Sequence, residues 1–326
     1  MPELPEVEVV RRGMLTHALG KRITGVNVHD TRSIRRSENT PEEFAHTLKD
    51  TTIIDVVRRG KYLWIILENA DGTRLETALV IHLGMSGQIL FKTSKFPPEK
   101  HLKITVTLGN QDHHSTAEPA AEQLRFVDQR IFGGMYLDTL IPVSDTRQHP
   151  VSASSASTLS LPYIPQSLNH IARDPLDTNF DIDEFRQKML KTSSAIKRLL
   201  LDQSTISGVG NIYADEALWR ARLHYAKQAK TMSLAKTREL VHSIQEVFSQ
   251  ALEAGGTSFD ALYVNVNGES GYFDRSLNAY GREGQLCYRC QENGVESTII
   301  REVMMKRSCY RCPRCQRAPR QKKTSS

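Results

Sequence analysis

All five cysteines of the chain lie near its C-terminal end, with spacings that suit metal ligands. Cys287 and Cys290 form one C-x2-C pair, and Cys312 and Cys315 form another further along. Two such pairs can place four thiolates tetrahedrally around one Zn²⁺, in a closed site that makes the metal structural. Cys309 and Cys312 have the same spacing, so the residues alone leave the second pair open.

The second residue is a proline, and a small residue after Met1 favours removal of the initiator methionine. Removal would expose the secondary amine of Pro2. An α-amino group has a pKa of about 7.7–8.0, so a sizeable fraction is neutral and nucleophilic at pH 7. Such an amine can form an iminium with a sugar aldehyde. Alternatively, Pro2, Pro5 and the adjacent Glu3 and Glu6 merely begin a helix, and these residues alone favour that interpretation.

Length and charge are compatible with a multidomain protein that binds a polyanion. The 326 residues suffice for two compact domains and a small appendage. The formal net charge is +6 and the sequence pI is about 9.0. The stretch from Arg301 to Lys323 is rich in Lys and Arg and contains one acid, Glu302. Clustered cations of this kind favour a nucleic-acid partner.

The sequence gives no indication of a membrane or secretory protein. The longest apolar stretches, such as Tyr62 to Leu67, are far too short to span a bilayer. The first ten residues, MPELPEVEVV, are acidic and lack the basic and apolar regions of a secretory signal. We therefore expect a cytoplasmic protein of bacterial type, whose clustered cysteines bind metal rather than form disulfides.

The first part of the chain is predicted to be one helix followed by β-structure. Leu4 to Leu19 places Val7, Val10 and Met14 on one helical face. Runs rich in β-branched residues follow, and they predict a sandwich or barrel over residues 1–143. These runs are ITGVNV, TIIDVV, KYLWIIL, LVIHLGM, GQILF, LKITVTL, LRFV and MYLDTL.

The rest of the chain changes from linker to helices. Gly109 to Gln123 and Ser144 to Ser167 are polar or low in complexity, and we expect both to be poorly ordered and without chemistry. A glycine turn, ISGVGN, separates two of the later helices, and a short β-type tail carries the cysteines. Helical periodicity is found at Asp181–Lys191, Ser194–Asp202, Ile212–Ala221 and Leu234–Ala254.

Short blocks in order across nearly the whole chain resemble the formamidopyrimidine-DNA glycosylases. The blocks are MPELPEVE, RRGKY, HLGMSG, DQRIFGG, GVGNIYADEAL, GGTSF, GYF, YGREG and CPRCQ. The resemblance implies an α+β multidomain protein. Its parts would be a β-sandwich with an N-terminal helix, a helical domain with a helix–two-turn–helix, and a C-terminal zinc β-hairpin.

The resemblance also implies domain boundaries. They would give a catalytic β-sandwich domain, a linker, a helical DNA-binding domain, a zinc hairpin and a basic tail. The corresponding ranges are 1–143, 144–172, 173–280, 281–317 and 318–326.

The catalytic roles implied by the resemblance fall on four residues. Pro2 would attack the sugar C1′ carbon, and Glu3 would act as general acid/base. Lys61 would assist elimination and contact phosphate. Arg307, five residues before Cys312, would grip phosphates around the lesion from the hairpin. The same correspondence implies that Cys287, Cys290, Cys312 and Cys315 hold the zinc and that Cys309 is spare, with no organic cofactor.

Three further residues match the part of the family that replaces an extruded base. Pulling a base from the stack costs a few kcal/mol, so Met85 and Phe132 would wedge into the hole. Arg130 would hydrogen-bond the orphaned cytosine. Met85 and Phe132 could instead be core residues, but flanking glycines favour loops.

Other DNA contacts are implied near the glycine turn. Asn211 and Tyr213 would join a phosphate cradle at a helix N-terminus. Lys197 and His101 match further phosphate contacts, although Lys197 could equally be an ordinary exposed lysine. Residues 257–272 resemble the loop that covers the flipped base.

We therefore expect a monomeric base-excision enzyme that removes oxidised purines from double-stranded DNA and cleaves abasic sites by β- and δ-elimination. An endonuclease VIII-type enzyme for oxidised pyrimidines is the nearest alternative. That class typically has PEGPE where this chain has PELPE, so Leu4 is the discriminator. A non-catalytic zinc-hairpin DNA-binding protein is a third possibility, which the presence of Pro2 and Glu3 disfavours.

Overall fold

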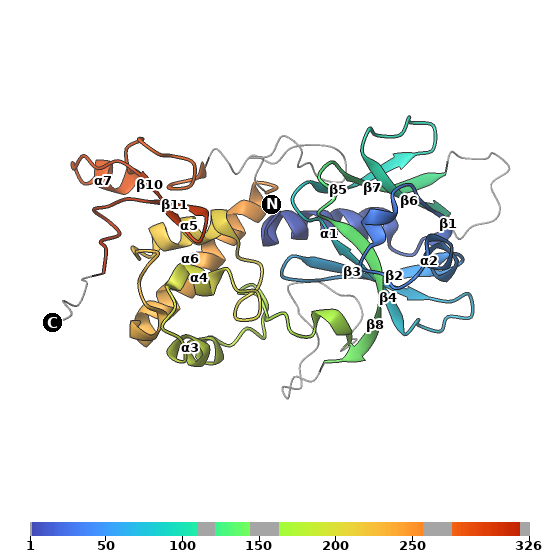
Figure 1. Cartoon of the computed structure of the whole chain (residues 1–326), viewed down its shortest axis with the longest axis horizontal. Helices are drawn as coiled ribbons and strands as arrows, with labels where there is room; N and C mark the ends of the chain where they lie inside the picture. Colours follow the sequence, from blue (N-terminus) through green and yellow to red (C-terminus); the bar gives the residue numbers. More distant parts are fainter. Residues whose placement is uncertain (1, 110–120, 144–162, 257–275, 320–326) are drawn as a thin grey trace.

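The computed structural model describes residues 2–109, 121–143, 163–256 and 276–319. The chain forms a sheet-rich half and a helical half side by side, and the N-terminus lies between them (Figure 1). The predicted lesion-covering loop, the end of the basic tail and most of the two predicted insertions lie outside the described residues.

The first half contains the predicted helix and all the predicted strands. One helix, α2, escaped the sequence analysis although Thr40 and Glu43 form a reciprocal capping box around Pro41 at its start. The helices are α1 (Leu4–Ala18) and α2 (Pro41–Leu48), with a 3₁₀ turn η1 (Thr31–Ile34). The strands are β1 (Arg22–Val28), β2 (Thr52–Arg59), β3 (Tyr62–Glu68), β4 (Thr77–His82), β5 (Gly87–Thr93), β6 (Leu102–Gly109), β7 (Glu122–Asp128), β8 (Gly134–Pro142) and β9 (Tyr163–Pro165).

Hydrogen bonds join the nine strands into one sheet, in the order β5-β7-β6-β1-β2-β3-β4-β8-β9. The sheet is bent into two layers, with β5, β6 and β7 over β2, β3 and β4 (Figure 1). Both layers and the apolar face of α1 contribute to one core, exemplified by Val10, Ile65 and Phe126. This arrangement confirms the predicted sandwich and fixes α1 against the sheet.

The expectation that both insertions are wholly unstructured is wrong at their edges. Strand β9 and the 3₁₀ turn η2 (Gln166–Leu168) fall within the predicted linker, and β9 pairs with the end of β8. Ile164 and Leu168 are buried on the second face of the sheet, which explains why this stretch folds. At the other insertion, Glu122 and Gln123 already belong to β7.

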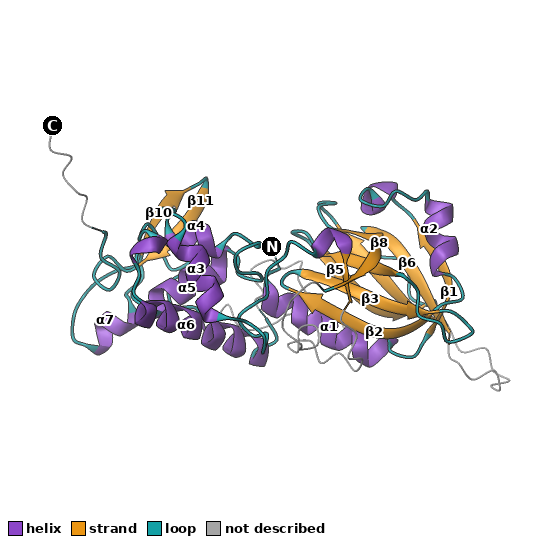
Figure 2. Cartoon of the chain, turned by 90° about the horizontal axis from the view of Figure 1, so that it is seen from below, coloured by secondary structure: helices purple, strands orange, loops and turns teal. Residues whose placement is uncertain are grey.

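The second half consists of helices and a small hairpin, as predicted (Figure 2). Its core includes Leu4, so the first turn of α1 packs against the helical half. Helices are α3 (Ile182–Leu190), α4 (Ile196–Leu200), α5 (Asn211–Arg220), α6 (Leu234–Glu253) and α7 (Tyr288–Glu292), with η3 (Ala229–Thr231). The hairpin strands are β10 (Ile300–Met304) and β11 (Arg307–Arg311).

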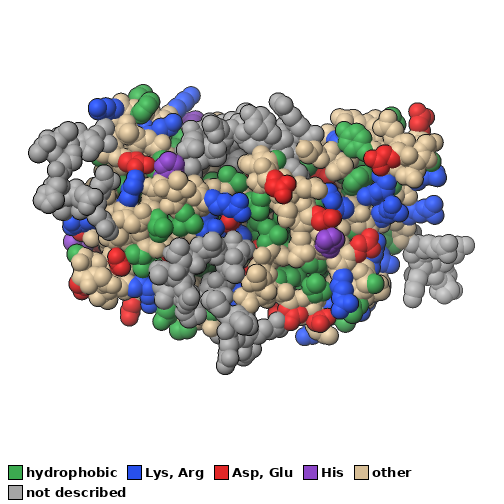
Figure 3. Space-filling model, turned by 180° about the vertical axis from the view of Figure 1, so that it is seen from behind, with side chains coloured by type: hydrophobic (Ala, Val, Ile, Leu, Met, Phe, Trp, Pro, Cys, Tyr) green, Lys and Arg blue, Asp and Glu red, His purple; other side chains and the backbone are tan. Residues whose placement is uncertain are grey.

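Within the described ranges, we find no helix with the length and apolar character needed to span a bilayer. On the face shown in Figure 3, coloured basic and acidic side chains are interspersed over both halves. The basic side chains on this face therefore do not form a single patch.

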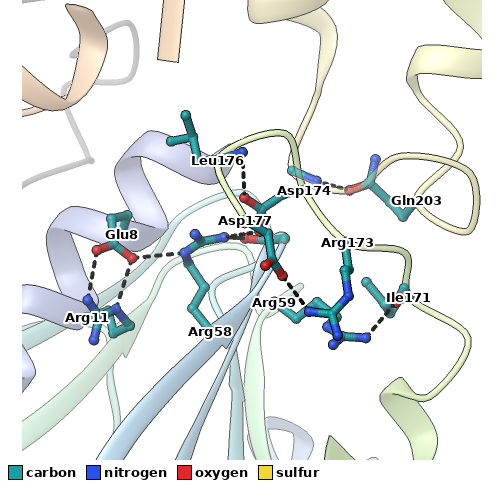
Figure 4. Close-up of polar contacts among 12 residues, drawn as sticks. Glu8, Arg11, Arg58, Arg59, Ile171, Arg173, Asp174, Leu176, Asp177 and Gln203 are labelled. Carbon is teal, nitrogen blue, oxygen red and sulfur yellow. Dashed lines mark hydrogen bonds and ion pairs between the residues drawn. The ribbon is translucent and has the colours of Figure 1, made fainter. Parts of the chain in front are cut away.

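A buried ion cluster joins the two halves (Figure 4). The Arg58 guanidinium on β2 donates to Glu8 on α1 at 2.9 Å and to Asp174, at the entry to the helical half, at 3.0 Å. It also donates to the carbonyl of Gly60 at 3.1 Å. Burial raises the pKa of Glu8, but bonds from Arg11 and the charge of Arg58 outweigh it and lower the pKa to about 2. One cation thus joins α1, the β2–β3 turn and the helical half.

Removing Arg58 would leave two buried carboxylates without their shared cation. We expect Arg58→Met to lower the free energy of unfolding by about 3–5 kcal/mol, measured by urea denaturation. Arg12→Ala is the matched control, because Arg12 binds the same Glu8 carboxylate from an exposed position. That variant should cost less than about 1 kcal/mol. Equal losses in the two variants would contradict this account.

Candidate active site

The N-terminal segment lies where the two halves of the chain meet. Pro2 is buried, and Glu3 is the N-cap residue of α1, where its side chain and that of Glu6 form a reciprocal capping box. The Leu4 amide donates to the carbonyl of Gly208 at 3.0 Å. The first residues of the sheet-rich half are therefore held by a turn of the helical half.

The Glu3 carboxylate caps a second helix as well as its own. It accepts hydrogen bonds from the backbone amides of Gly210 at 2.6 Å, Ile212 at 2.9 Å and Tyr213 at 3.3 Å, all at the start of α5. A Cβ atom on Gly210 would lie 2.3 Å from the Glu3 carboxyl carbon, so the approach requires glycine. Free amides and the helix dipole favour a carboxylate at this position.

The electrostatics of Glu3 and Lys61 are linked. Burial raises the pKa of Glu3, against the opposing effects of Lys61 and the α5 amides. Lys61 lies in the β2–β3 turn and is 7% exposed. Burial lowers the pKa of Lys61, Glu3 opposes this, and the charge of Arg307 lowers it further. The charges of three predicted catalytic residues, Glu3, Lys61 and Arg307, are therefore coupled, and Glu3 is the sequence neighbour of Pro2.

The amides at the start of α5, where a phosphate cradle was predicted, donate to the Glu3 carboxylate in this structure. The phosphate contacts of Asn211 and Tyr213 stay predictions. Tyr213 is fully buried, and its hydroxyl donates to Glu6 at 2.5 Å. Its side chain therefore binds the N-terminal segment from the helical half. The sequence indicated an anion at this helix start but not that the anion belongs to the chain itself.

The three predicted wedge residues lie on two loops that pack against each other. Met85 is 37% exposed and Phe132 is 55% exposed, which excludes the alternative that they belong to the core. The Arg130 guanidinium lies 3.9 Å from the Met85 sulfur. Gly84 has φ +63°, and a Cβ there would lie 2.3 Å from the Gly133 amide nitrogen.

Two residues that the sequence analysis missed hold these loops. The buried Asp128 accepts from the Ser86 hydroxyl at 2.6 Å and from the amides of Arg130 and Gly133 at 3.1 and 2.8 Å. Arg35 donates to the carbonyls of Phe132 and Gly133. Aspartates often accept hydrogen bonds from the backbone of a following turn, so the role of Asp128 could have been predicted from the sequence. Nothing in the sequence around Arg35 predicts its contact with this loop.

His101 is partly exposed just before β6, and its carbonyl accepts from the Asp128 amide at 3.0 Å. Its contact with phosphate stays a prediction.

Lys197 and Asn211 contact the hairpin. Lys197 is fully buried, so the alternative that it is an ordinary exposed lysine is wrong. Its ammonium binds Asp215 at 2.6 Å and donates to the Ser308 carbonyl at 2.9 Å. The Asn211 amide donates to the same carbonyl at 3.0 Å. Burial raises the pKa of Asp215 to about 7, although Lys197 opposes it.

The four cysteines predicted as ligands cluster between α7, the hairpin and α5. Their sulfur atoms lie within 4.8 Å of one another, and neighbouring pairs are 3.5 to 3.9 Å apart. A tetrahedral site with Zn–S bonds of about 2.3 Å separates its sulfurs by about 3.8 Å. The cluster therefore fits a metal ion such as zinc. Cys309 is buried but outside this cluster, so the pairing of Cys309 with Cys312 as ligands is wrong.

Neighbouring side chains form hydrogen bonds with the cysteine sulfur atoms. The Trp219 indole donates to the Cys287 sulfur at 3.4 Å, and the Ser297 hydroxyl lies 3.3 Å from the Cys312 sulfur. Burial raises the pKa of Cys312, but hydrogen bonds from Ser297 and backbone amides outweigh it and lower the pKa to about 7. A thiol of this kind readily supplies the thiolate that metal binding needs.

Comparisons with known proteins agree with this geometry. A family model described as the formamidopyrimidine-DNA glycosylase N-terminal domain matches residues 1–135, and one described as the formamidopyrimidine-DNA glycosylase H2TH domain matches residues 171–262. A formamidopyrimidine-DNA glycosylase of Streptomyces coelicolor is 49% identical over 98% of this chain and 99% of its own. One from Nocardioides is 49% identical over the whole of this chain and 98% of its own.

A solved structure of Lactococcus lactis Fpg, in complex with DNA that contains an abasic site, is also similar. It matches with a TM-score of 0.75 and 28% identity, over 97% of this chain and 100% of that one. The two domain matches and the near-complete overlap with these relatives show that the chain belongs to the formamidopyrimidine-DNA glycosylase family of DNA-repair enzymes.

Proposed function

We propose that this DNA glycosylase excises oxidised purines from duplex DNA through the amine of Pro2 and then cleaves the strand. The observation that carries the proposal is the position of Glu3, a buried carboxyl held by three α5 amides directly beside Pro2. If Glu3 served only as the N-cap of α1, its carboxylate would not need to bind the helical half as well. This arrangement instead gives the N-terminal amine a fixed position.

The chemistry follows from these groups. With Met1 removed, the Pro2 nitrogen attacks C1′, the glycosidic bond breaks, and the base leaves with a proton. Glu3 donates a proton to the ring oxygen as the sugar opens, which leaves an iminium between Pro2 and C1′. Loss of a C2′ proton then breaks the C3′–O bond by β-elimination, and δ-elimination breaks the C5′–O bond. The lowered pKa of Lys61 makes it a suitable amine to move these protons.

We favour purines over pyrimidines because of Leu4 and the wedge residues. Leu4 replaces the glycine typical of the endonuclease VIII class, and it is fully buried in the helical core. Met85, Arg130 and Phe132 form an exposed group suited to filling the gap opposite an orphaned cytosine. Among the similar Lactococcus lactis structures, one holds N7-benzyl-Fapy-dG DNA and another holds DNA with an oxidised pyrimidine. The preference of this enzyme must therefore be measured on duplexes with an oxidised purine and on duplexes with an oxidised pyrimidine.

We further propose that the four-cysteine cluster holds one structural Zn²⁺ and that no organic cofactor takes part. Zinc would fold the β10–β11 hairpin, which is too small to be stable alone. We expect the enzyme to act as a monomer on DNA that contains oxidised bases or abasic sites.

The role of Pro2 can be tested by borohydride trapping on two duplexes, one with 8-oxoguanine opposite cytosine and one with an oxidised pyrimidine. We expect a cross-link at Pro2, mainly with the purine duplex. Pro2→Gly, which removes the ring that fixes the amine, should abolish lyase activity while duplex binding survives. Strong lyase activity in this variant would contradict the assignment of Pro2 as the nucleophile. A mass spectrum showing that the native protein retains Met1 would also contradict it.

The role of Glu3 predicts a characteristic pH dependence. Glu3→Gln keeps one acceptor oxygen for the α5 amides but cannot donate an acidic proton, so base excision should slow by roughly 10²–10⁴-fold. In the wild type, excision should fall as the pH rises through the raised pKa of Glu3, because only the protonated form donates. Single-turnover rates against pH should show that fall in the wild type alone. An unchanged profile in the variant would exclude Glu3 as the acid.

The metal site offers a matched pair of cysteine variants. Cys312→Ser should lose the bound zinc and weaken DNA binding, because a ligand is missing. Cys309→Ser, three residues away and outside the cluster, should keep one zinc per chain. Elemental analysis and duplex binding measure both effects. Zinc loss in the Cys309 variant alone would mean that the ligand set is wrong.

A further inference from the structure

The hairpin is attached to the helical half through its backbone. The Lys197 ammonium and the Asn211 side-chain amide both donate to the Ser308 carbonyl, at 2.9 and 3.0 Å. The Tyr310 amide donates to the Asp215 carboxylate at 3.0 Å. These bonds hold the two residues of β11 that flank Cys309.

The two charged anchors are a buried pair. Lys197 and Asp215 lie 2.6 Å apart, and their side chains are 0% and 1% exposed. Burying a charge is costly unless it is paired, so each depends on the other. Each of them also makes a hydrogen bond to the β11 backbone, so the pair fixes that strand against the helices.

Arg307 is the first residue of β11, the strand that Lys197 and Asp215 bind. It directly precedes Ser308, its side chain is exposed, and its charge reaches Lys61 strongly enough to lower the pKa of that lysine. The preceding turn is tight, since Met305 and Lys306 both have positive φ, at 52° and 60°. Movement of the β11 backbone would therefore carry Arg307 with it.

We propose that Lys197 and Asp215 are positioning residues that hold β11 where Arg307 can bind a DNA phosphate. The inference rests on the proposed function of Arg307. It gives Lys197 a role that its burial permits, in place of a direct phosphate contact. It also assigns a role to Asp215, a residue for which the sequence indicated none.

A double-mutant cycle separates positioning from general stabilisation. The variants are Lys197→Met, Arg307→Ala and their combination, all with zinc bound. The probe is a duplex with a tetrahydrofuran abasic-site analogue, which the enzyme cannot process. Arg307→Ala should weaken binding roughly tenfold or more in the wild-type background, the value of a hydrogen bond between charged groups. It should also reduce the salt dependence of binding by about one phosphate contact.

In the Lys197→Met background, Arg307→Ala should cost less than about twofold, because the arginine is no longer held in place. Asp215→Asn should reduce the effect of Arg307→Ala in the same way. If a single variant fails to fold, the combination Lys197→Met/Asp215→Asn leaves no unpaired buried charge and serves as the background.

Lys236→Met is the control, since Lys236 pairs with Glu239 on the surface of α6. In that background Arg307→Ala should cost as much as in the wild type. Equal cost in the Lys197→Met background would overturn the inference, and so would the absence of any cost in the wild type. Borohydride trapping by the wild type tests the catalytic proposal separately, because its outcome does not depend on this binding cycle.

Discussion

The carboxylate of Glu3 at the start of α5 is the interaction on which the rest of the site depends. It joins residues 207 positions apart in the sequence and brings the first turn of α1 against the first turn of α5. A helix start offers unsatisfied amides, and a carboxylate is the natural anion to occupy them. Here the anion is a candidate catalytic group, so the bond that joins the two halves also positions the chemistry.

Two clusters of buried charges support this arrangement. Arg58 binds Glu8 on α1, the carbonyl of Gly60 next to Lys61, and Asp174 in the helical half. Lys197 and Asp215 pair with each other and bind the backbone of the hairpin that carries Arg307. In both clusters buried charges are satisfied by residues from separate parts of the chain. A rigid relation between distant segments is what a site assembled from several segments requires.

Much of this architecture could be predicted from the sequence. Apolar periodicity predicted most helices and strands, because burial of one face decides both. Cysteine spacing predicted a four-thiolate metal site but left open whether Cys309 or Cys315 pairs with Cys312, a choice that the family resemblance made. Position along the sequence could not reveal which polar residues are buried. Lys197 and Tyr213 lie on helices where exposed and buried faces are both available, and only the packing of the hairpin and of α1 encloses them. Helix α2 could have been found from its capping box.

The start of α1 has a consequence for how the protein is made. Glu3 is translated well before the residues whose amides fix it, which are residues 210–213. At ordinary rates of synthesis these follow on the order of tens of seconds later. During that time the Glu3 carboxylate of the nascent chain has no α5 amides to bind. The candidate active site is complete only after the helical half has been translated and has folded against the sheet-rich half.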